Sequence, residues 1–209
     1  MNTRRQQGFT LYELLITLLV IGVILSLGVP NLQEFTRNGR LTATANDLHS
    51  SFLLARSEAA RLPSVPATNS VTICGSLTPM VDATAACDGN FSDGWIVFVD
   101  ADGDIVRDAG EVILRAYPAI DTTVSLSTNG GATYFSFGTN GLGRGDVNAG
   151  TNGPSLVSAS VCDSRGNAVA AGNDATARAV VATPIGRATV LRDHTQVGQQ
   201  IANNGLSCP

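Results

Sequence analysis

Glu13 is an acid at the start of an otherwise apolar run, and this placement makes it a candidate for a functional charge. The sixteen residues after it, Leu14 to Val29, carry no charge. A carboxylate in an apolar medium either takes up a proton or pairs with a cation, and an acid inside a membrane segment is costly enough to indicate a function. We expect Glu13 to pair with a cation. The alternative is that it reaches the membrane interface, which would also suit Thr10 and Tyr12.

A second group of carboxylates follows the spacing of a calcium-binding loop. Asp100, Asp102, Asp104 and Glu111 occupy its positions 1, 3, 5 and 12. Position 6 of such loops is glycine, but here it is Ile105. Aspartate and glycine are also the ordinary residues of hairpin turns. An acidic turn without metal is therefore the favoured interpretation, and a calcium site is the weaker one.

The four cysteines are Cys74, Cys87, Cys162 and Cys208. None forms a C-x-x-C pair and neither histidine lies at metal-ligand spacing from one, so zinc is not expected. An even number of cysteines in an exported domain favours disulfides. Of the three possible pairings we favour the local one, in which Cys74–Cys87 closes a short loop and Cys162–Cys208 holds the C-terminus. Free buried thiols are the alternative.

No residues form an enzyme signature. No serine or cysteine lies convincingly beside a base and an acid, and no phosphate-binding loop occurs, so neither catalysis nor a cofactor is expected. All thirteen basic residues are arginine, against seventeen acidic residues. Loss of the first eight residues would remove Arg4 and Arg5 and bring the net charge from −4 to near −6. Such a chain has no bulk attraction to nucleic acid or anionic lipid.

The apolar run has the length of a membrane span. Phe9 to Val29 would form a helix of about 31 Å, enough to cross a bilayer core. Arg4 and Arg5 precede it and no basic residue follows before Arg37, so the positive-inside rule keeps the N-terminus in the cytoplasm and exports the rest. A secretory signal cut near Ser26–Gly28 is the alternative, but the run is too long for that class and contains an acid.

Residues 30–62 are predicted to form an amphipathic helix. Pro30 either kinks the apolar helix or opens a new helical stretch, and Pro63 and Pro66 end it. Apolar residues recur at spacings of four and three and so mark one helix face. These are Leu41, Ala45, Leu48, Phe52, Ala55, Ala59 and Leu62. Alanine at three of the seven positions indicates close packing on a sheet rather than a coiled coil.

Beyond Pro66 the pattern changes to short apolar strands separated by Gly, Asn and Asp. The expected strands are 71–74, 95–99, 112–117, 124–126, 133–137, 156–161, 179–183 and 188–191. Such spacings predict antiparallel sheets, and no second helix of comparable strength is expected. The predicted fold class is α+β: a long N-terminal transmembrane helix continues into an amphipathic helix packed on an antiparallel β-sheet domain.

The start of the chain resembles a type IV prepilin signal, through Gly8, Phe9, Thr10, Leu11, Glu13 and Pro30. The resemblance implies cleavage between Gly8 and Phe9 by prepilin peptidase, with N-methylation of Phe9. It also implies that Glu13 pairs with the N-terminal amine of a neighbouring subunit in a filament. Pro30 lies where that family has its helix-kinking proline.

The rest of the chain resembles the FimT/GspH group of minor pilins and pseudopilins. The similarity lies in 55–59 (A-R-S-E-A), the hairpin 94–100 with 111–115, the strand and turn 135–141, and the C-terminal stretches 162–166 and 185–187, ending near Cys208. It implies a leader at 1–8, a transmembrane assembly helix at 9–29, an amphipathic helix at 30–62 and a β-rich periplasmic domain at 63–209. The type IV pilin-like fold is implied with it.

The resemblance implies a structural subunit of the bacterial inner membrane that enters a type IV pilus or a type II secretion pseudopilus. The implied partners are other major and minor pilins or pseudopilins and the inner-membrane assembly platform. Three roles stay open: pilus priming or tip, protein secretion, and DNA uptake in natural transformation. Some FimT-like proteins bind DNA through G-R-x-R, of which residues 186–189 keep only Arg187. Arg178 and Arg192 are candidates for the missing charge.

Overall fold

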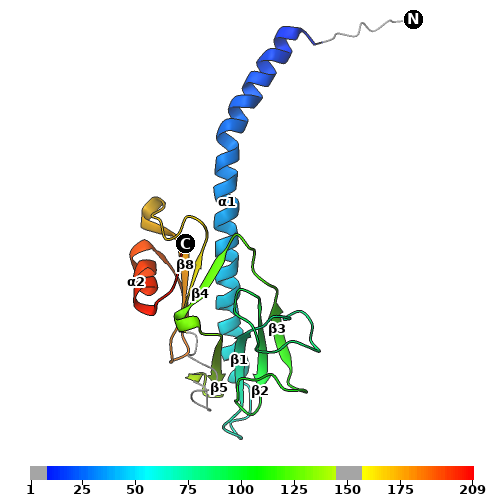
Figure 1. Cartoon of the computed structure of the whole chain (residues 1–209), viewed down its shortest axis with the longest axis vertical. Coiled ribbons are helices and arrows are strands. Elements are labelled where there is room, and N and C mark those ends of the chain that lie inside the picture. Colours follow the sequence, from blue (N-terminus) through cyan, green and yellow to red (C-terminus); the bar gives the residue numbers. More distant parts are fainter. Residues whose placement is uncertain (1–8, 145–156) are drawn as a thin grey trace, which may run out of the picture. The chain divides into compact units, whose positions relative to one another are not determined.

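The computed structural model describes residues 9–144 and 157–209, and comprises two units, residues up to Gly39 and residues Arg40–Pro209. The first helix, α1 (Leu11–Ala59), contributes to both (Figure 1). The leader at residues 1–8, including Gly8, lies outside the described residues. The expected long helix on an antiparallel β-domain is confirmed.

In the first unit, α1 is a helix without a local tertiary core. The hydroxyl Oγ1 of Thr10 accepts a hydrogen bond from the backbone N–H of Glu13 at 3.2 Å, which is how a threonine N-cap begins a helix. Pro30 lies inside the helix rather than at a break between two helices. Its missing N–H removes one intrahelical donor, and nearby the side-chain amide of Asn31 donates to the carbonyl of Leu27 at 3.2 Å.

In the second unit, α1 buries one face. Its buried residues are Leu41, Ala45, Leu48, Ser51, Phe52, Ala55 and Ala59. Six of the seven positions of the predicted stripe are therefore confirmed as buried, and Leu62 packs against the same core partly buried. The α-helix ends at Ala59, and turn hydrogen bonds carry the chain on to Leu62 before Pro63.

Five strands form the first sheet, in the order β3-β2-β1-β5-β6, with every pair antiparallel. They are β1 (Ser70–Gly75), β2 (Trp95–Asp100), β3 (Ile113–Tyr117), β5 (Tyr134–Gly138) and β6 (Gly143–Arg144). The first four agree with the predicted strands to within a residue or so. The two residues of β6 were not predicted, because they are too short to show a pattern.

Four strands form the second sheet, in the order β4-β7-β8-β9, again antiparallel. They are β4 (Ser125–Thr128), β7 (Ser158–Cys162), β8 (Asp174–Ala182) and β9 (Ala188–Asp193). Short 3-10 helices lie at Asn129–Gly131 and Ala171–Asn173. β8 begins five residues before its predicted start, since Ala175 and Ala177 are buried strand residues that alternate with polar ones.

The helix α2 (His194–Asn204) is an element that the sequence analysis did not predict. It begins after Asp193, whose carboxylate accepts from the N–H of Gln196, and it ends at Gly205, which has a left-handed conformation with φ 61°. N-cap aspartate and C-terminal glycine are helix signals. Only Val197 and Ile201 mark its apolar face, so this helix is much weaker in pattern than α1 and was not predicted.

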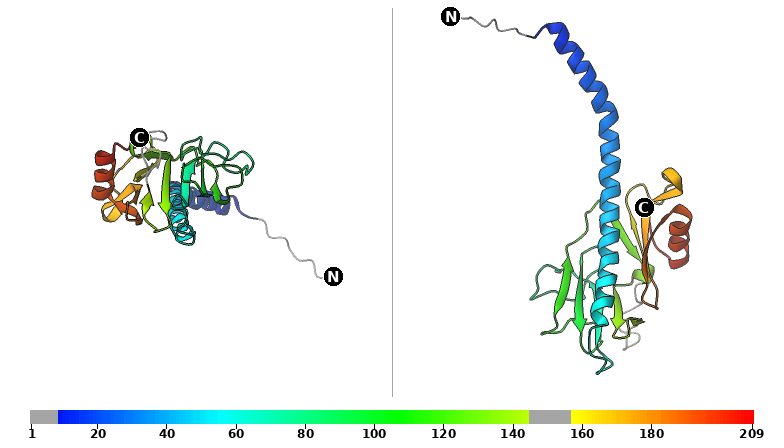
Figure 2. Two further views of the ribbon diagram at one scale, coloured as in Figure 1. Left: turned by 90° about the horizontal axis from the view of Figure 1, so that it is seen from below. Right: turned by 180° about the vertical axis from the view of Figure 1, so that it is seen from behind.

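The residues 40–59 of α1 lie across the inner faces of both sheets (Figure 2). The central core joins Leu48 and Phe52 of the helix to Phe135 and Phe137 of β5 and to Val180 of β8. Phe52 makes edge-to-face contacts with both phenylalanines, at centroid distances of 5.2 and 6.4 Å. Each sheet has a further, smaller core on its outer face.

Candidate assembly and binding sites

The first turn of α1 carries the expected assembly residues. Phe9 precedes the helix and is exposed, and Glu13 lies in the first turn with its side chain exposed. An acid in this turn is favoured by the positive end of the helix dipole. Within the described residues no ion pair is formed by Glu13. The carboxylate is therefore presented outward, where a partner from another molecule can reach it.

The stretch that follows Glu13 presents apolar side chains on all sides. Among the described residues, α1 is the one helix long and apolar enough to cross a membrane, with a mean hydropathy of 2.3 over its most apolar 18 residues. None of that window is buried within the chain. An all-round apolar helix needs either a protein core or lipid around it, and the described part of the chain supplies no such core.

The acidic turn after β2 uses its carboxylates to hold backbone N–H groups. Asp100 is fully buried and accepts from the N–H groups of Gly103 at 2.6 Å and Ile105 at 3.2 Å, and from Thr72 Oγ1 at 2.8 Å. Burial raises the pKa of Asp100 even though these hydrogen bonds lower it. Glu111 accepts from the N–H groups of Ala101 at 2.8 Å and Asp108 at 3.0 Å.

These hydrogen bonds are those expected of an acidic turn. Oxygen atoms of Asp100, Asp102 and Asp104 all lie within 4.8 Å of one another. Both oxygens of Asp100 and both of Glu111 already accept hydrogen bonds from within the protein. Ile105 holds a positive φ of 69°, the conformation for which glycine is usual. An acidic turn without metal stays the favoured interpretation, and a calcium site here stays the weaker one.

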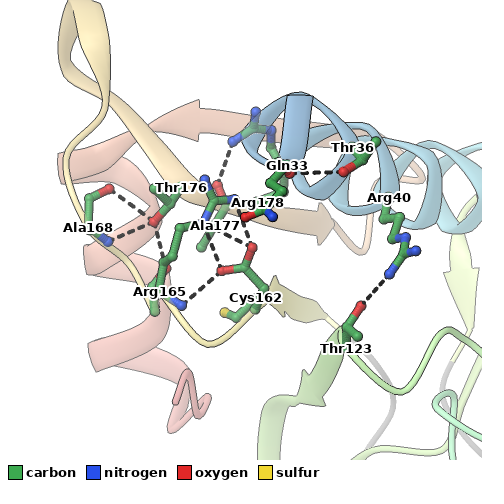
Figure 3. Close-up of polar contacts among 12 residues, drawn as sticks. Gln33, Thr36, Arg40, Thr123, Cys162, Arg165, Ala168, Thr176, Ala177 and Arg178 are labelled. Atoms are coloured by element: carbon green, nitrogen blue, oxygen red, sulfur yellow. Dashed lines mark hydrogen bonds and ion pairs between the residues drawn. The ribbon is translucent and has the colours of Figure 1, made fainter. Parts of the chain in front are cut away.

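Arg178 lies in the interior and is not available on the surface. Only 6% of it is exposed, and its Nη1 donates to the carbonyls of Ala175 at 2.6 Å and Ala177 at 2.8 Å (Figure 3). Burial lowers its pKa, and the positive charge of Arg192 lowers it further. Because strand residues alternate between faces, Arg178 shares the inner face with Val180. Arg178 was a candidate for the charge missing beside Arg187, and that expectation was wrong because the side chain is buried.

The other two arginines are exposed at opposite ends of the β8–β9 hairpin. Arg187 lies in the turn, where its N–H donates to Thr183 Oγ1 at 3.2 Å. Arg192 lies five residues along, about 16 Å away in a strand. A different arginine comes close to the turn: Arg56 of α1, whose Nε lies 3.0 Å from where a side chain on Gly186 would begin. The A-R-S-E-A stretch contains Arg56, but sequence spacing gave no sign of this proximity.

All four cysteines form disulfides, in the pairs favoured from the sequence. Cys74 and Cys87 have Cα atoms 5.4 Å apart, and those of Cys162 and Cys208 are 5.7 Å apart. The first bridge ties the loop after β1 to the outer face of the first sheet. The second ties the end of the chain to β7, beside α2. These bridges hold the outer layers of the domain in place.

The fold and the exposed apolar helix together define a membrane-anchored α+β protein of pilin type. Residues 44–186 match the family model "Type II transport protein GspH", and residues 3–29 match the "Prokaryotic N-terminal methylation motif". The chain belongs to the GspH family, since that match covers more than half of it, and it is a minor pilin or pseudopilin of the FimT/GspH type. No curated protein matches the chain significantly.

Two solved structures of the type IV minor pilin FimU of Pseudomonas aeruginosa resemble the chain. One, in space group P21, has 16% identity and a TM-score of 0.46, and the alignment covers 84% of this chain and 96% of FimU. The other, in P65, has 16% identity and a TM-score of 0.44, and the alignment covers 81% of this chain and 97% of FimU.

Together with the methylation motif, the exposed helix identifies a membrane anchor followed by a globular C-terminal domain.

Proposed function

We propose that the chain is a minor subunit of a type IV pilus or of a type II secretion pseudopilus. The observation that supports this most is the apolar α1 segment with one exposed carboxylate in its first turn. In the bacterial inner membrane this segment anchors the subunit, with the domain after Gly39 on the periplasmic side. On assembly, helices of successive subunits pack together and Glu13 meets the amine of a neighbour's Phe9. The domain needs no catalytic group for this role.

Processing of the N-terminus is the first test. Prepilin peptidase cleaves between Gly8 and Phe9 and methylates the new Phe9 amine. Intact-mass measurement of the protein extracted from membranes should give a chain that begins at Phe9 and carries one methyl group. A mature chain that begins after Ser26 contradicts this, because it is the product of an ordinary secretory signal.

The second test is Glu13→Val, with Glu34→Val as its matched control on the same helix. Removing a carboxylate from an apolar segment lowers the cost of insertion, so the variant should reach the membrane as well as the wild type. It should be lost from sheared filaments, since the charge pairing between subunits is gone. Glu34 lies beyond the apolar run and its loss should leave incorporation unchanged. Equal incorporation of all three proteins means that Glu13 only reaches the interface.

DNA binding is a second candidate, and it is supported by the proximity of Arg56 to the Gly186–Arg187 turn. Arg56 and Arg187 are both exposed, so they form a local pair of cations on a domain that is acidic overall. Thr189 stands where the related motif has its second arginine. Two phosphate contacts without that arginine support only weak, sequence-independent binding.

Fluorescence titration of the full chain in detergent against duplex DNA at low salt tests this candidate. Arg187→Gln and Arg56→Gln should each abolish or weaken binding. Thr189→Arg should strengthen binding and should steepen the fall of the logarithm of the binding constant with the logarithm of the salt concentration by about one unit. Arg192→Gln is the matched control at the far end of the hairpin. No binding by the wild type and none by Thr189→Arg removes this candidate and leaves the filament role alone.

A further inference from the structure

The two sheets have four edge strands, and three of them are engaged by other parts of the chain. Beside β6, the N–H of Gly143 donates to the carbonyl of Pro184 at 2.7 Å. The carbonyl of Ala188 in β9 is 3.2 Å from Nε2 of His49. In β4 the contact is made by a side chain and not by the backbone: the hydroxyl of Ser127 accepts from the N–H of Ser207 at 3.0 Å. β3 has no such contact: in the described chain, no other segment hydrogen-bonds to its outward backbone groups.

The register identifies which backbone groups of β3 face outward. The N–H of Val99 donates to the carbonyl of Val112, so Val97, two residues earlier, also bonds toward β3. Val97 pairs with Arg115, and Trp95 pairs with Tyr117. The residue between them, Ala116, therefore directs its N–H and C=O away from β2. β3 is the outermost strand on this side of its sheet (Figure 1).

A groove of about 540 Å³ runs beside this edge. Its apolar lining includes Met80, Val112, Ile113 and Ala116, of which Met80 is 64% and Val112 is 60% exposed. Arg107 fixes the outer wall by donating to Asp82, from Nη1 to the carbonyl at 2.8 Å and from Nη2 to Oδ1 at 3.2 Å. An unpaired strand edge beside an apolar groove is the arrangement that accepts an added strand.

We propose that an extended segment of a neighbouring filament subunit, a pilin of another sequence, adds to the free edge of β3. This inference rests on the proposed filament role. The edge requires an extended backbone, and the groove favours apolar side chains on alternate residues. The exposed Arg115, whose Nη1 donates to the hydroxyl of Tyr117 at 3.2 Å, favours an acidic residue opposite it. A second copy fits less well. Two β3 strands paired about a two-fold axis form a closed dimer, and a register centred on Arg115 places like charges together.

The test places a photo-crosslinking amino acid at Val112 in the full chain in its native cells. Val169 is the matched control, since it has the same 60% exposure and lies outside the groove. Position 112 should give one adduct, with another pilin, and position 169 should give none. Ala116→Pro removes the outward N–H and should reduce the adduct about tenfold, whereas Ala116→Ser keeps that N–H and the adduct. Arg115→Glu should reduce it without any change to the backbone.

Three results overturn the inference. The first is no adduct from position 112 in a chain that is recovered from filaments, which leaves the filament role intact. The second is an adduct between two copies of this chain or with a protein outside the filament. The third is an adduct of equal yield with Ala116→Pro and Arg115→Glu. Absence of the unmodified chain from filaments contradicts the filament role itself, and this inference with it.

Discussion

The two sheets share α1 on their inner faces but have different covers on their outer faces. The outer core of the first sheet contains Ile96, Phe98 and Tyr134, and the loops that carry Ala85 and Ile105 cover it. The outer core of the second sheet contains Ala175, Ala177, Ala179 and Cys162, and α2 covers it through Val197. Each cover is fastened by one disulfide. The sheet residues on the outer face are therefore large in the first sheet, where loops cover them, and small in the second sheet, where a helix covers them.

The difference has a packing reason. A helix with its side chains is a cylinder about 10 Å across. Small residues on the sheet beneath it let the helix lie close to the strands. An irregular loop has few inward side chains of its own, so the sheet must supply the volume. Since interiors are packed to the density of crystals, each cover selects the size of the residues beneath it. The following predictions test whether the two outer cores differ in this way.

The largest expected effect is that of Phe98→Ala on the first sheet. Phe98 is fully buried, and loss of a buried phenylalanine side chain costs about 3–5 kcal/mol in the free energy of unfolding. Val197→Ala on α2 removes much less volume and should cost about 2 kcal/mol. Urea unfolding of the full chain in detergent, followed by the fluorescence of Trp95, the single tryptophan, measures both. Equal losses in the free energy of unfolding would mean that the two outer cores contribute equally to stability.

The two disulfides should rank the covers in the opposite order, with the larger contribution to the free energy of unfolding coming from the bridge beside α2. The Cys162–Cys208 bridge spans 46 residues and Cys74–Cys87 spans 13. Loop-entropy models give about 4 and about 3 kcal/mol for such loops. The paired variants Cys162→Ser with Cys208→Ser, and Cys74→Ser with Cys87→Ser, should follow that order in urea unfolding. A larger loss from the shorter bridge means that the loop over the first sheet depends more on its covalent link than α2 does.

A smaller effect is expected from filling the space beneath α2. Ala177→Leu adds three carbons where β8 meets the helix and should cost about 1–3 kcal/mol by overpacking. Ala119→Leu adds the same carbons at an exposed position and is the matched control, with an expected change within about 0.5 kcal/mol. A stable Ala177→Leu variant with unchanged unfolding means that α2 does not lie tightly on the sheet.

Residues with strong local patterns could be predicted from the sequence. The 4,3 spacing of the α1 stripe identified its buried face, and short apolar runs located eight of the nine strands. α2 was missed because Val197 and Ile201 are its main apolar residues, and the small residues beneath it, such as Ala177, do not mark a helix contact. Its signals, Asp193 and Gly205, lie at the helix ends.

Sites that depend on tertiary contacts could not be predicted in the same way. Arg178 lies just before the predicted strand 179–183, but β8 begins at Asp174 and so includes it. Its side chain therefore lies on a buried face of the strand. Arg56 and Gly186 are far apart in sequence and meet through the docking of α1 on the second sheet. The free edge of β3 follows from strand order, which no local pattern encodes. Glu13 could be singled out from the sequence because its setting, one acid in an apolar run, is entirely local, and its role in assembly stays a prediction.

The last and smallest expected effect is a pH dependence of opposite sign in the two covers. Burial raises the pKa of Asp100, the last residue of β2, above its ordinary value of 3.8. The hydrogen bond from the N–H of Gln196 lowers the pKa of Asp193, at the start of α2, below the same value. The folded state thus holds the proton of Asp100 more tightly than the unfolded state does, and that of Asp193 less tightly.

The signs follow from proton linkage. For Asp100, the folded state binds more protons, so the free energy of unfolding falls as the pH rises through the window above 3.8. For Asp193, the stabilising contribution is present above pH 3.8 and is lost as the pH falls below that value.

Urea unfolding of the wild type, Asp100→Asn and Asp193→Asn from about pH 2.5 to pH 6 separates the two contributions, since each variant removes one titrating group. The difference between the wild type and Asp100→Asn should decline with rising pH, and the difference between the wild type and Asp193→Asn should decline with falling pH. If both differences change in the same direction with pH, both covers respond alike to acid, because a buried carboxylate at the end of β2 and a half-buried one at a helix start then behave as one kind of group.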